Sequence, residues 1–166
     1  MNNRFKFKPI LKTVLWTVIS LLIIYIICFI IFVIGTSPLR KQSKSVSGLA
    51  LSKTPITKVE DTYHMSQSKV SNSVKGVDRK GKTYYFVHLE NSNKAYLYKA
   101  NEGISENKVK NIFNEKHPGH DNLKLEFGWY QNKPVWEISY KKNNGNYGYA
   151  IYSFRTGRQL FYVDNL

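Results

Sequence analysis

The chain has 166 residues, and its 25 lysine and arginine residues outnumber its 11 aspartates and glutamates, which gives a formal net charge of +14. This length suits one ordinary domain or two small ones. The single cysteine excludes an intramolecular disulfide. The sequence contains no zinc-finger, phosphate-loop or dinucleotide-binding motif, which argues against the nucleic-acid-binding and nucleotide-binding classes that depend on those motifs.

The first third of the chain is dominated by an apolar run. No side chain from Thr13 to Leu39 is charged, and Val14 to Ile34 reads VLWTVISLLIIYIICFIIFVI. A helix needs about 20 such residues to span a bilayer core, whereas a helix of a soluble core is rarely apolar all round over that length. The run therefore predicts a single transmembrane helix over residues 13–35.

Two processed alternatives fit this run less well. A cleaved signal peptide has an apolar region of about 7–15 residues and then a small-x-small cleavage site, which GTSPLRK does not supply. A lipoprotein anchor would use Cys28, but the bulky Ile27 directly precedes it. We interpret Cys28 as a small apolar residue inside the bilayer.

The charges that flank the run predict its orientation. Four basic side chains and no acidic one precede it, namely Arg4, Lys6, Lys8 and Lys12. Lysine and arginine mark the cytoplasmic side, while long downstream domains translocate largely regardless of their charge. We expect residues 1–12 to form a cytoplasmic tail and residues 36–166 to lie outside the cell membrane.

The segment predicted to lie outside is basic. Nucleic acid is not an expected partner there, because little of it is met outside a cell. Its lysines are scattered rather than clustered, so a solvated basic surface is the simpler interpretation, and binding to anionic wall polymers stays open.

An internal repeat organises this segment. Residues 57–100 align without a gap with residues 121–164 when Gly81 is placed on Gly145. Apolar positions then coincide in pairs: Val59 with Leu123, Tyr63 with Phe127, Met65 with Trp129, Val74 with Ile138, Tyr85 with Tyr149, Val87 with Ile151, Tyr96 with Leu160, and Tyr98 with Tyr162. This self-similarity predicts two copies of one unit, over residues 36–101 and 102–166.

The second copy shows the elements of the unit. Ser105 is a candidate N-cap, Val109, Ile112 and Phe113 form an i, i+3, i+4 stripe, and Pro118-Gly119 ends the helix. Four alternating apolar segments follow, with predicted hairpin turns at Asn143–Gly145 and at Gly157. The apolar residues of the central strands are Trp136, Ile138 and Tyr140, which we expect to form the structural core with the helix stripe.

The first copy has a weaker helix signal. Ser37 and Pro38 suit an N-cap and first helical position, but the following residues are serine-rich, which lowers helix propensity. The helix is therefore expected to be short or to continue from the membrane helix. The predicted fold class is α+β, with each unit a helix packed on an antiparallel sheet.

The polar residues do not form a recognisable catalytic or metal-binding pattern. His117 and His120 flank a turn, and Glu126 and Glu137 fall on adjacent predicted strands, where strand carboxylates are usually solvated. We predict no catalytic residue, no metal ligand and no cofactor. The aromatic residues remain as candidates for a partner surface. We single out Trp129, Tyr130 and Tyr152, with Tyr130 expected in an exposed patch; burial between the two repeats is the alternative.

At this point the sequence resembles a known family. The motifs are G-I-S at Gly103 to Ser105, P-V-W-E at Pro134 to Glu137, and the F-x-T-G turn at Phe154 to Gly157. With the basic tail, the apolar run and the repeat, these resemble the TseB-like (YpmB) family of Gram-positive bacteria. That family has a membrane anchor and tandem PepSY-like, cystatin-like domains.

The resemblance implies a non-enzymatic regulator of cell-wall elongation, and so of peptidoglycan synthesis, that contacts a class B penicillin-binding transpeptidase outside the membrane. A PepSY-type inhibitor or chaperone of a secreted protease is the alternative that the fold permits by analogy. An enzyme acting on a wall polymer is disfavoured by the missing catalytic pattern.

Overall fold

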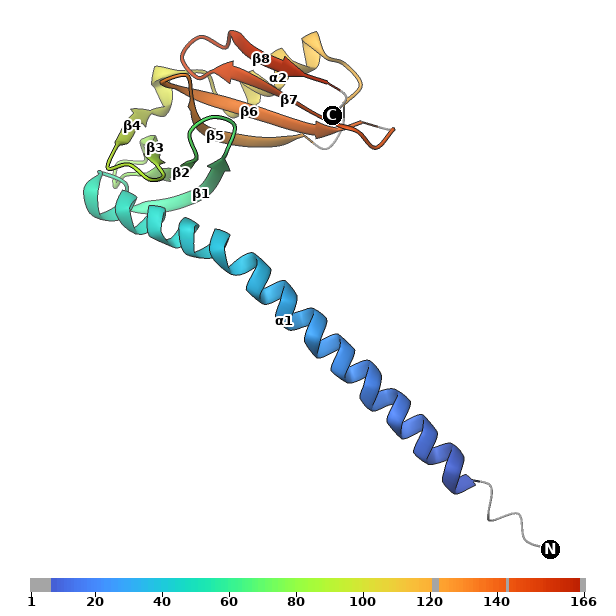
Figure 1. The fold of residues 1–166 in the computed structure, drawn as a ribbon. Coiled ribbons are helices and arrows are strands. Elements are labelled where there is room, and N and C mark those ends of the chain that lie inside the picture. The colour runs from blue at the N-terminus through green and yellow to red at the C-terminus, as the bar shows by residue number, and fades with distance from the viewer. Residues whose placement is uncertain (1–6, 121–122, 143, 165–166) are drawn as a thin grey trace, which may run out of the picture. The chain divides into compact units, whose positions relative to one another are not determined.

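The computed structural model describes residues 7–120, 123–142 and 144–164 (Figure 1). The chain divides into two compact units, residues 1–41 and residues 42–166. In chain order the elements are α1 (Phe7–Lys53), β1 (Lys58–Met65), β2 (Ser71–Val77), β3 (Thr83–Leu89), β4 (Ala95–Lys99), the short 3-10 helix η1 (Ala100–Glu102), α2 (Glu106–Lys116), β5 (Lys124–Tyr130), β6 (Lys133–Lys141), β7 (Tyr147–Ser153) and β8 (Gln159–Val163).

Helix α1 contains the apolar run. Residues Leu11–Val33 are long and apolar enough to cross a membrane, by length and composition. The expectation that Ser37 and Pro38 begin a new helix is wrong, because both lie inside the continuous α1. A cap is favoured only where backbone N–H groups lack carbonyl partners, and here the preceding turn is already helical. The alternative, in which the first repeat's helix continues from the apolar helix, is the one observed.

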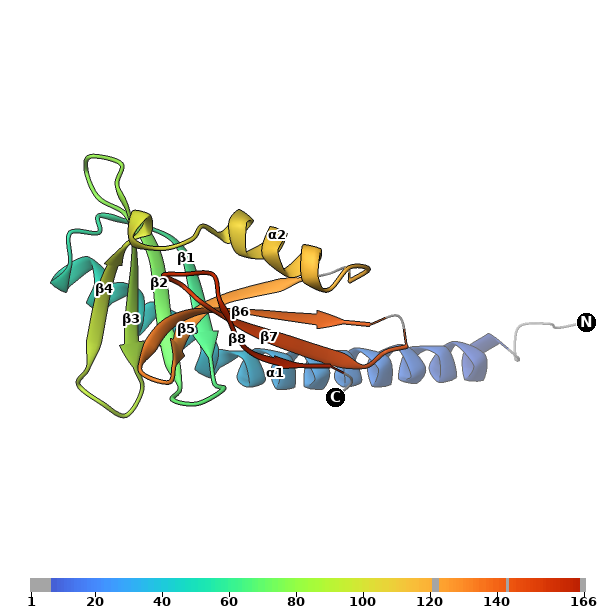
Figure 2. The same ribbon diagram turned by 90° about the horizontal axis from the view of Figure 1, so that it is seen from above.

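The eight strands form two antiparallel sheets in sequential order, β1-β2-β3-β4 and β5-β6-β7-β8 (Figure 2). Each sheet follows a helix, so the α+β class is confirmed. The alignment that places Gly81 on Gly145 also makes β3 coincide with β7 and β4 with β8, with the same first and last positions. Both glycines have positive φ angles, 75° and 90°, which glycine adopts without steric cost. Asn143, predicted in the second turn, lies outside the described residues.

Helix α2 begins where the sequence predicts. Ser105 is its N-cap, and the Ser105 hydroxyl accepts a hydrogen bond from the backbone N–H of Lys108 at 3.2 Å. Val109 and Phe113 are fully buried, whereas Ile112 is half-buried. The apolar stripe of this short helix therefore points into the core.

The two sheets share one core within residues 42–166. The Tyr85 ring of β3 lies 4.5 Å from the Phe127 ring of β5, and Trp129 of β5 stacks on Tyr96 of β4 with 4.2 Å between ring centroids. We call the face of the second sheet (β5–β8) that contacts α2 and carries Phe127 and Trp136 its inner face, and the opposite face, which the end of β1 reaches through Met65, its outer face. Trp136, Ile138 and Tyr140 lie on the inner face and are at most 2% exposed.

The C-terminal part of α1 covers the other face of the first sheet. Val46 and Ala50 are buried there against Val74, Tyr84 and Phe86. The first sheet is thus covered on both faces, by α1 and by the shared core, while the outer face of the second sheet has no helix against it among the described residues.

Candidate protein-binding surface

The outer face of the second sheet carries a cluster of aromatic and aliphatic side chains. Val135 and Ile151 are buried at its centre with Met65, and Tyr130, Tyr149 and Leu160 pack around them half-exposed. Tyr149 stacks on Phe161, which is 37% exposed, with 5.4 Å between ring centroids. A pocket of about 130 Å³ lies among these residues, lined by Gln67, Tyr130, Tyr149, Ile151 and Phe161.

The three predicted contact residues are separated by the fold. Trp129 is 5% exposed and Tyr152 is fully buried, both in the inner core, so their prediction as surface contacts is wrong. The first sheet covers the face to which they point, and the Tyr152 hydroxyl donates to Gln159 Oε1 at 3.1 Å. Tyr130 points to the outer face, is half-buried and lines the pocket. Tyr130 therefore remains the candidate contact.

Glu126 and Glu137 are the residues whose environment the sequence analysis missed. They lie directly opposite each other on β5 and β6 and are only 7% and 8% exposed, rather than solvated. Lys124 Nζ lies 2.6 Å from Glu126 Oε1, and the backbone N–H of His64 donates to Glu126 Oε2 at 3.0 Å. Met65, the last residue of β1, and Gln67, in the loop that follows, reach this face. Alternation along the strands puts both glutamates on the same face of the sheet as Tyr130. No local signal in the sequence predicts that Met65 and Gln67 cover them.

Burial, with a contribution from the neighbouring Glu126 carboxylate, raises the pKa of Glu137 to about 7. The Lys124 charge and a hydrogen bond from the Gln67 side chain act in the opposite direction without cancelling the rise. Glu137 Oε2 has no hydrogen-bond partner among the described residues. The outer face thus combines aromatic side chains with an incompletely satisfied acidic group.

The histidines of the HPGH turn take part in ring packing. His117 stacks on Tyr162 with 4.0 Å between ring centroids, and its Nε2 is 3.1 Å from Gln159 Oε1. His120 stacks on Tyr140 at 4.3 Å. Within the described ranges, no three side chains of histidine, cysteine, aspartate or glutamate are grouped as a metal site would require. Asp121, next to His120, lies outside those ranges.

A partly buried ion pair joins α2 to the first sheet. Glu106 Oε1 in the first turn of α2 accepts hydrogen bonds from the hydroxyls of Tyr63 and Tyr85, both at 3.2 Å, and lies 3.0 Å from Lys75 Nζ. Burial alone would raise the pKa of Glu106, but the hydrogen bond and charge of Lys75, together with the two hydroxyls, hold it below its ordinary value. This contact fixes the helix end against β1, β2 and β3.

Acidification should therefore weaken the fold at Glu106. Its pKa is lower in the folded than in the unfolded chain, so its contribution is present above the unfolded value of 4.5 and is lost as pH falls through the folded pKa. We expect the melting temperature to fall between about pH 5 and pH 3, and Glu106→Gln to reduce that slope. Thermal melts at several pH values measure this. Glu115→Gln, at an exposed site of the same helix, serves as the control, and an equal change in slope for both variants would contradict the assignment.

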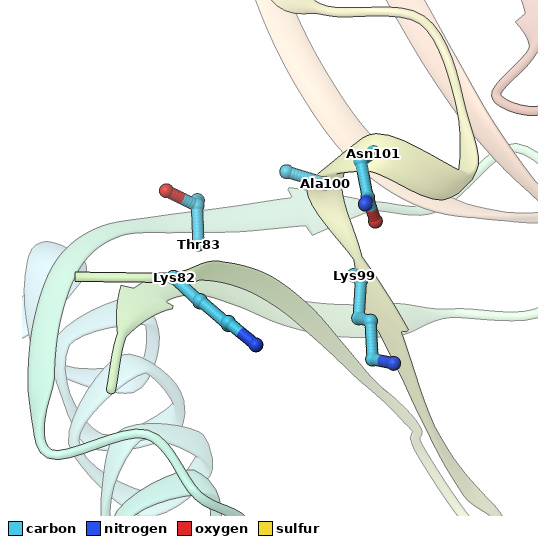
Figure 3. A pocket seen from close by; sticks show the side chains of 5 residues that line it. All are labelled: Lys82, Thr83, Lys99, Ala100 and Asn101. Atoms are coloured by element: carbon cyan, nitrogen blue, oxygen red, sulfur yellow. The ribbon is translucent and has the colours of Figure 1, made fainter. Parts of the chain in front are cut away.

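A second pocket lies at the ends of β3 and β4. It has a volume of about 310 Å³ and is lined by Lys82, Thr83, Lys99, Ala100 and Asn101. Figure 3 shows that the Lys82 and Lys99 side chains extend to the same side. Neither ammonium group has a salt bridge to a carboxylate in the described part of the chain. This basic spot leaves the anionic-polymer interpretation open without defining a specific site.

The fold and its surfaces define a class of protein: an α+β domain of two antiparallel sheets that follows one long apolar helix and presents an aromatic face. No protein-family profile matches the chain. Over 88 residues it is 31% identical to a protein of Bacillus subtilis (strain 168) named probable cell wall elongation regulator TseB, and the aligned part covers 52% of this chain and 55% of that protein. The alignment thus spans little more than half of the relative's length.

A solved structure shares the fold. The YpmB protein from Bacillus subtilis superposes with a TM-score of 0.62, covering 72% of this chain and 94% of that chain, at 24% identity. The resemblance to the TseB-like (YpmB) family is confirmed by these two similarities. The curated relative is named as a regulator rather than as an enzyme.

Proposed function

We propose that this protein is a membrane-anchored, extracytoplasmic regulator of cell-wall elongation that acts by binding a class B penicillin-binding transpeptidase. The observation that carries the proposal is the similarity to TseB, whose name assigns it to cell wall elongation. The shared fold with YpmB supports it. In this proposal the protein acts through contacts and needs no catalytic residue of its own.

The anchor in this proposal is the segment Leu11–Val33. The basic residues that precede it favour a cytoplasmic N-terminus, which leaves residues 42–166 outside the cell membrane. An anchor holds the domain close to a membrane-bound transpeptidase and so raises the effective concentration of one for the other. We further propose that residues 36–101 and 102–166 are two PepSY-like, cystatin-like units; the recurrence of one helix and four sequential strands supports this division.

The orientation is directly testable. We expect alkaline phosphatase fused after Leu166 to be active in cells, because that enzyme folds only after export. A fluorescent protein that matures only in the cytoplasm should stay dark at the same position. The reverse result, a bright fluorescent fusion with an inactive phosphatase fusion, would place the domain in the cytoplasm and contradict the proposed function.

The partner is tested by affinity purification of the full-length chain from crosslinked membranes. The expected result is enrichment of a class B transpeptidase over a control bait that carries only residues 1–41, which include the apolar segment. Enrichment of a secreted protease without a transpeptidase would favour the protease inhibitor or chaperone instead.

A further inference from the structure

Two turns at one end of the second sheet line a pocket of about 540 Å³, which we call the turn pocket. They are the turn between β5 and β6 and the turn between β7 and β8. The lining includes three basic side chains, three neutral polar ones and no acidic one: Lys133, Arg155, Arg158, Gln131, Ser153 and Thr156. The three basic side chains are exposed and form no salt bridge with a carboxylate in the described part of the chain. The turn pocket is therefore positively charged.

The hydroxyl groups of the turn pocket are held in place by the turn between β7 and β8. The Ser153 hydroxyl oxygen accepts the backbone N–H of Thr156 at 3.4 Å, and the Thr156 hydroxyl oxygen accepts that of Arg158 at 3.3 Å. A hydroxyl that accepts a hydrogen bond still has its own proton to donate. Arginine binds phosphate oxygens through two parallel hydrogen bonds. The turn pocket thus offers an anion two guanidinium groups, one ammonium group and two hydroxyl groups.

The turn pocket adjoins the basic pocket at the ends of β3 and β4, where the Lys82 and Lys99 side chains extend to the same side (Figure 3). We call this the β3–β4 pocket. A backbone hydrogen bond joins the two linings, because the Ile104 N–H, just after η1, donates to the Phe154 carbonyl at 2.8 Å. Phe154 directly precedes Arg155, and η1 directly follows Lys99. The fold thus brings the basic side chains of both pockets to one region of residues 42–166.

The acidic residues beside these pockets already have partners. Glu102 of η1 accepts the Lys99 backbone N–H at 3.3 Å. Asp78, in the turn before β3, accepts two backbone N–H groups at 2.8 and 2.9 Å. Glu106 is paired with Lys75. The five basic side chains of the two pockets outnumber the two carboxylates that lack a basic partner in this set, so the region attracts anions.

We propose that the turn pocket and the β3–β4 pocket together bind one extended polyanion, a polyol-phosphate polymer of the cell wall. The net charge of +14 attracts a polyanion, and a single small anion or lipid headgroup would fill only one of the two pockets. A protein partner fits less well, because the core of a protein interface is depleted of charged residues. The proposal rests on the extracytoplasmic placement in the proposed function, but it involves neither the transpeptidase nor the outer aromatic face.

The test measures the binding of fluorescently labelled poly(glycerol phosphate) to the full-length chain in nanodiscs of neutral lipid. At about 0.1 M salt we expect the double variant Arg155→Gln, Arg158→Gln to bind at least about 10-fold more weakly than the wild type, because two charge contacts are lost. The slope of log affinity against log salt concentration should fall by roughly 1.4, about 0.7 for each contact with a flexible polyanion. Both arginines are exposed, so the melting temperature should not change.

Two further double variants separate a site from diffuse attraction. Lys108→Gln, Lys116→Gln removes two exposed charges of α2 that line neither pocket, and it should leave the affinity nearly unchanged. Lys82→Gln, Lys99→Gln should weaken binding as the arginine variant does, because one polymer occupies both pockets. An equal loss in the α2 variant, or a loss confined to one of the two pockets, would overturn the inference.

Competitors identify the occupant. Poly-glutamate of matched charge presents carboxylates, and vesicles that contain phosphatidylglycerol present lipid phosphates. We expect both to displace the labelled polymer less effectively than unlabelled poly(glycerol phosphate) does. Equal displacement by either one would assign the pockets to an acidic protein segment or to a membrane surface and overturn the inference. Failure of the wild-type chain to bind the polymer also overturns it and leaves the proposed function standing, because this assay contains no transpeptidase. Polymer binding without transpeptidase capture would remove only the proposed partner.

Discussion

Replacing Trp136 by alanine is expected to lower the free energy of unfolding of residues 42–166 by about 3–5 kcal/mol, the range for emptying a buried large aromatic site. Trp136 is fully buried at the junction of both sheets. Its indole lies edge-on to the Tyr85 ring at 5.2 Å and 4.8 Å from the Phe127 ring. Its Nε1–H donates to the Ile104 carbonyl at 3.0 Å, just before α2. Truncation removes the contacts of both sheets at once and leaves that carbonyl without its donor.

Urea unfolding of a fragment that covers residues 42–166 measures this loss. Tyr147→Ala is the control, because Tyr147 is an aromatic residue of the same sheet that is 56% exposed, and surface substitutions usually change stability by no more than about 0.5 kcal/mol. A loss below about 1 kcal/mol for Trp136→Ala would show that this core is not the main support of the fold.

Replacing Gly128 by alanine is expected to destabilise the same unit by about 1–3 kcal/mol, the usual cost of overpacking. Gly128 lies on β5, where a Cβ atom would approach Met65 Cβ to 2.7 Å and Ser71 Oγ to 2.8 Å. Ser71 cannot move freely, since its hydroxyl accepts the Trp129 backbone N–H at 3.1 Å. The glycine therefore permits the end of β1 and the start of β2 to lie directly against the second sheet.

Gly48→Ala provides a control of opposite sign. Gly48 lies in α1, and a Cβ atom there would have no heavy atom within 4 Å, so alanine should stabilise the helix by roughly 0.5–1 kcal/mol. Urea melts of both variants in the 42–166 fragment decide the matter. If Gly128→Ala and the wild type have the same free energy of unfolding, the close packing of Met65 and Ser71 against Gly128 does not contribute to stability, and the prediction is wrong.

Local signals in the sequence were sufficient for much of the fold. The apolar run predicts a long helix, the Ser105 cap predicts the start of α2, and the glycines at 145 and 157 predict hairpin turns, where the structure has positive φ angles at both glycines. These features depend on residues a few positions apart, and their physical causes act within one turn or one strand. The alternation of apolar and polar residues in the strands, which recurs after each helix, is also a local property.

The tertiary structure alone decided which surfaces are free. Alternation along a strand says that Trp129 and Tyr130 face opposite sides, but it does not say which side another element will cover. The first sheet packs on the inner face and buries Trp129 and Tyr152, while the residues that follow β1 reach the outer face and bury Glu137. Both outcomes depend on contacts between residues far apart in the chain, so no local pattern encodes them. The sequence by itself thus determined the elements and the faces of each strand, and only the packing of the first sheet and its hairpin against the second sheet determined which aromatic residues and which carboxylates are buried.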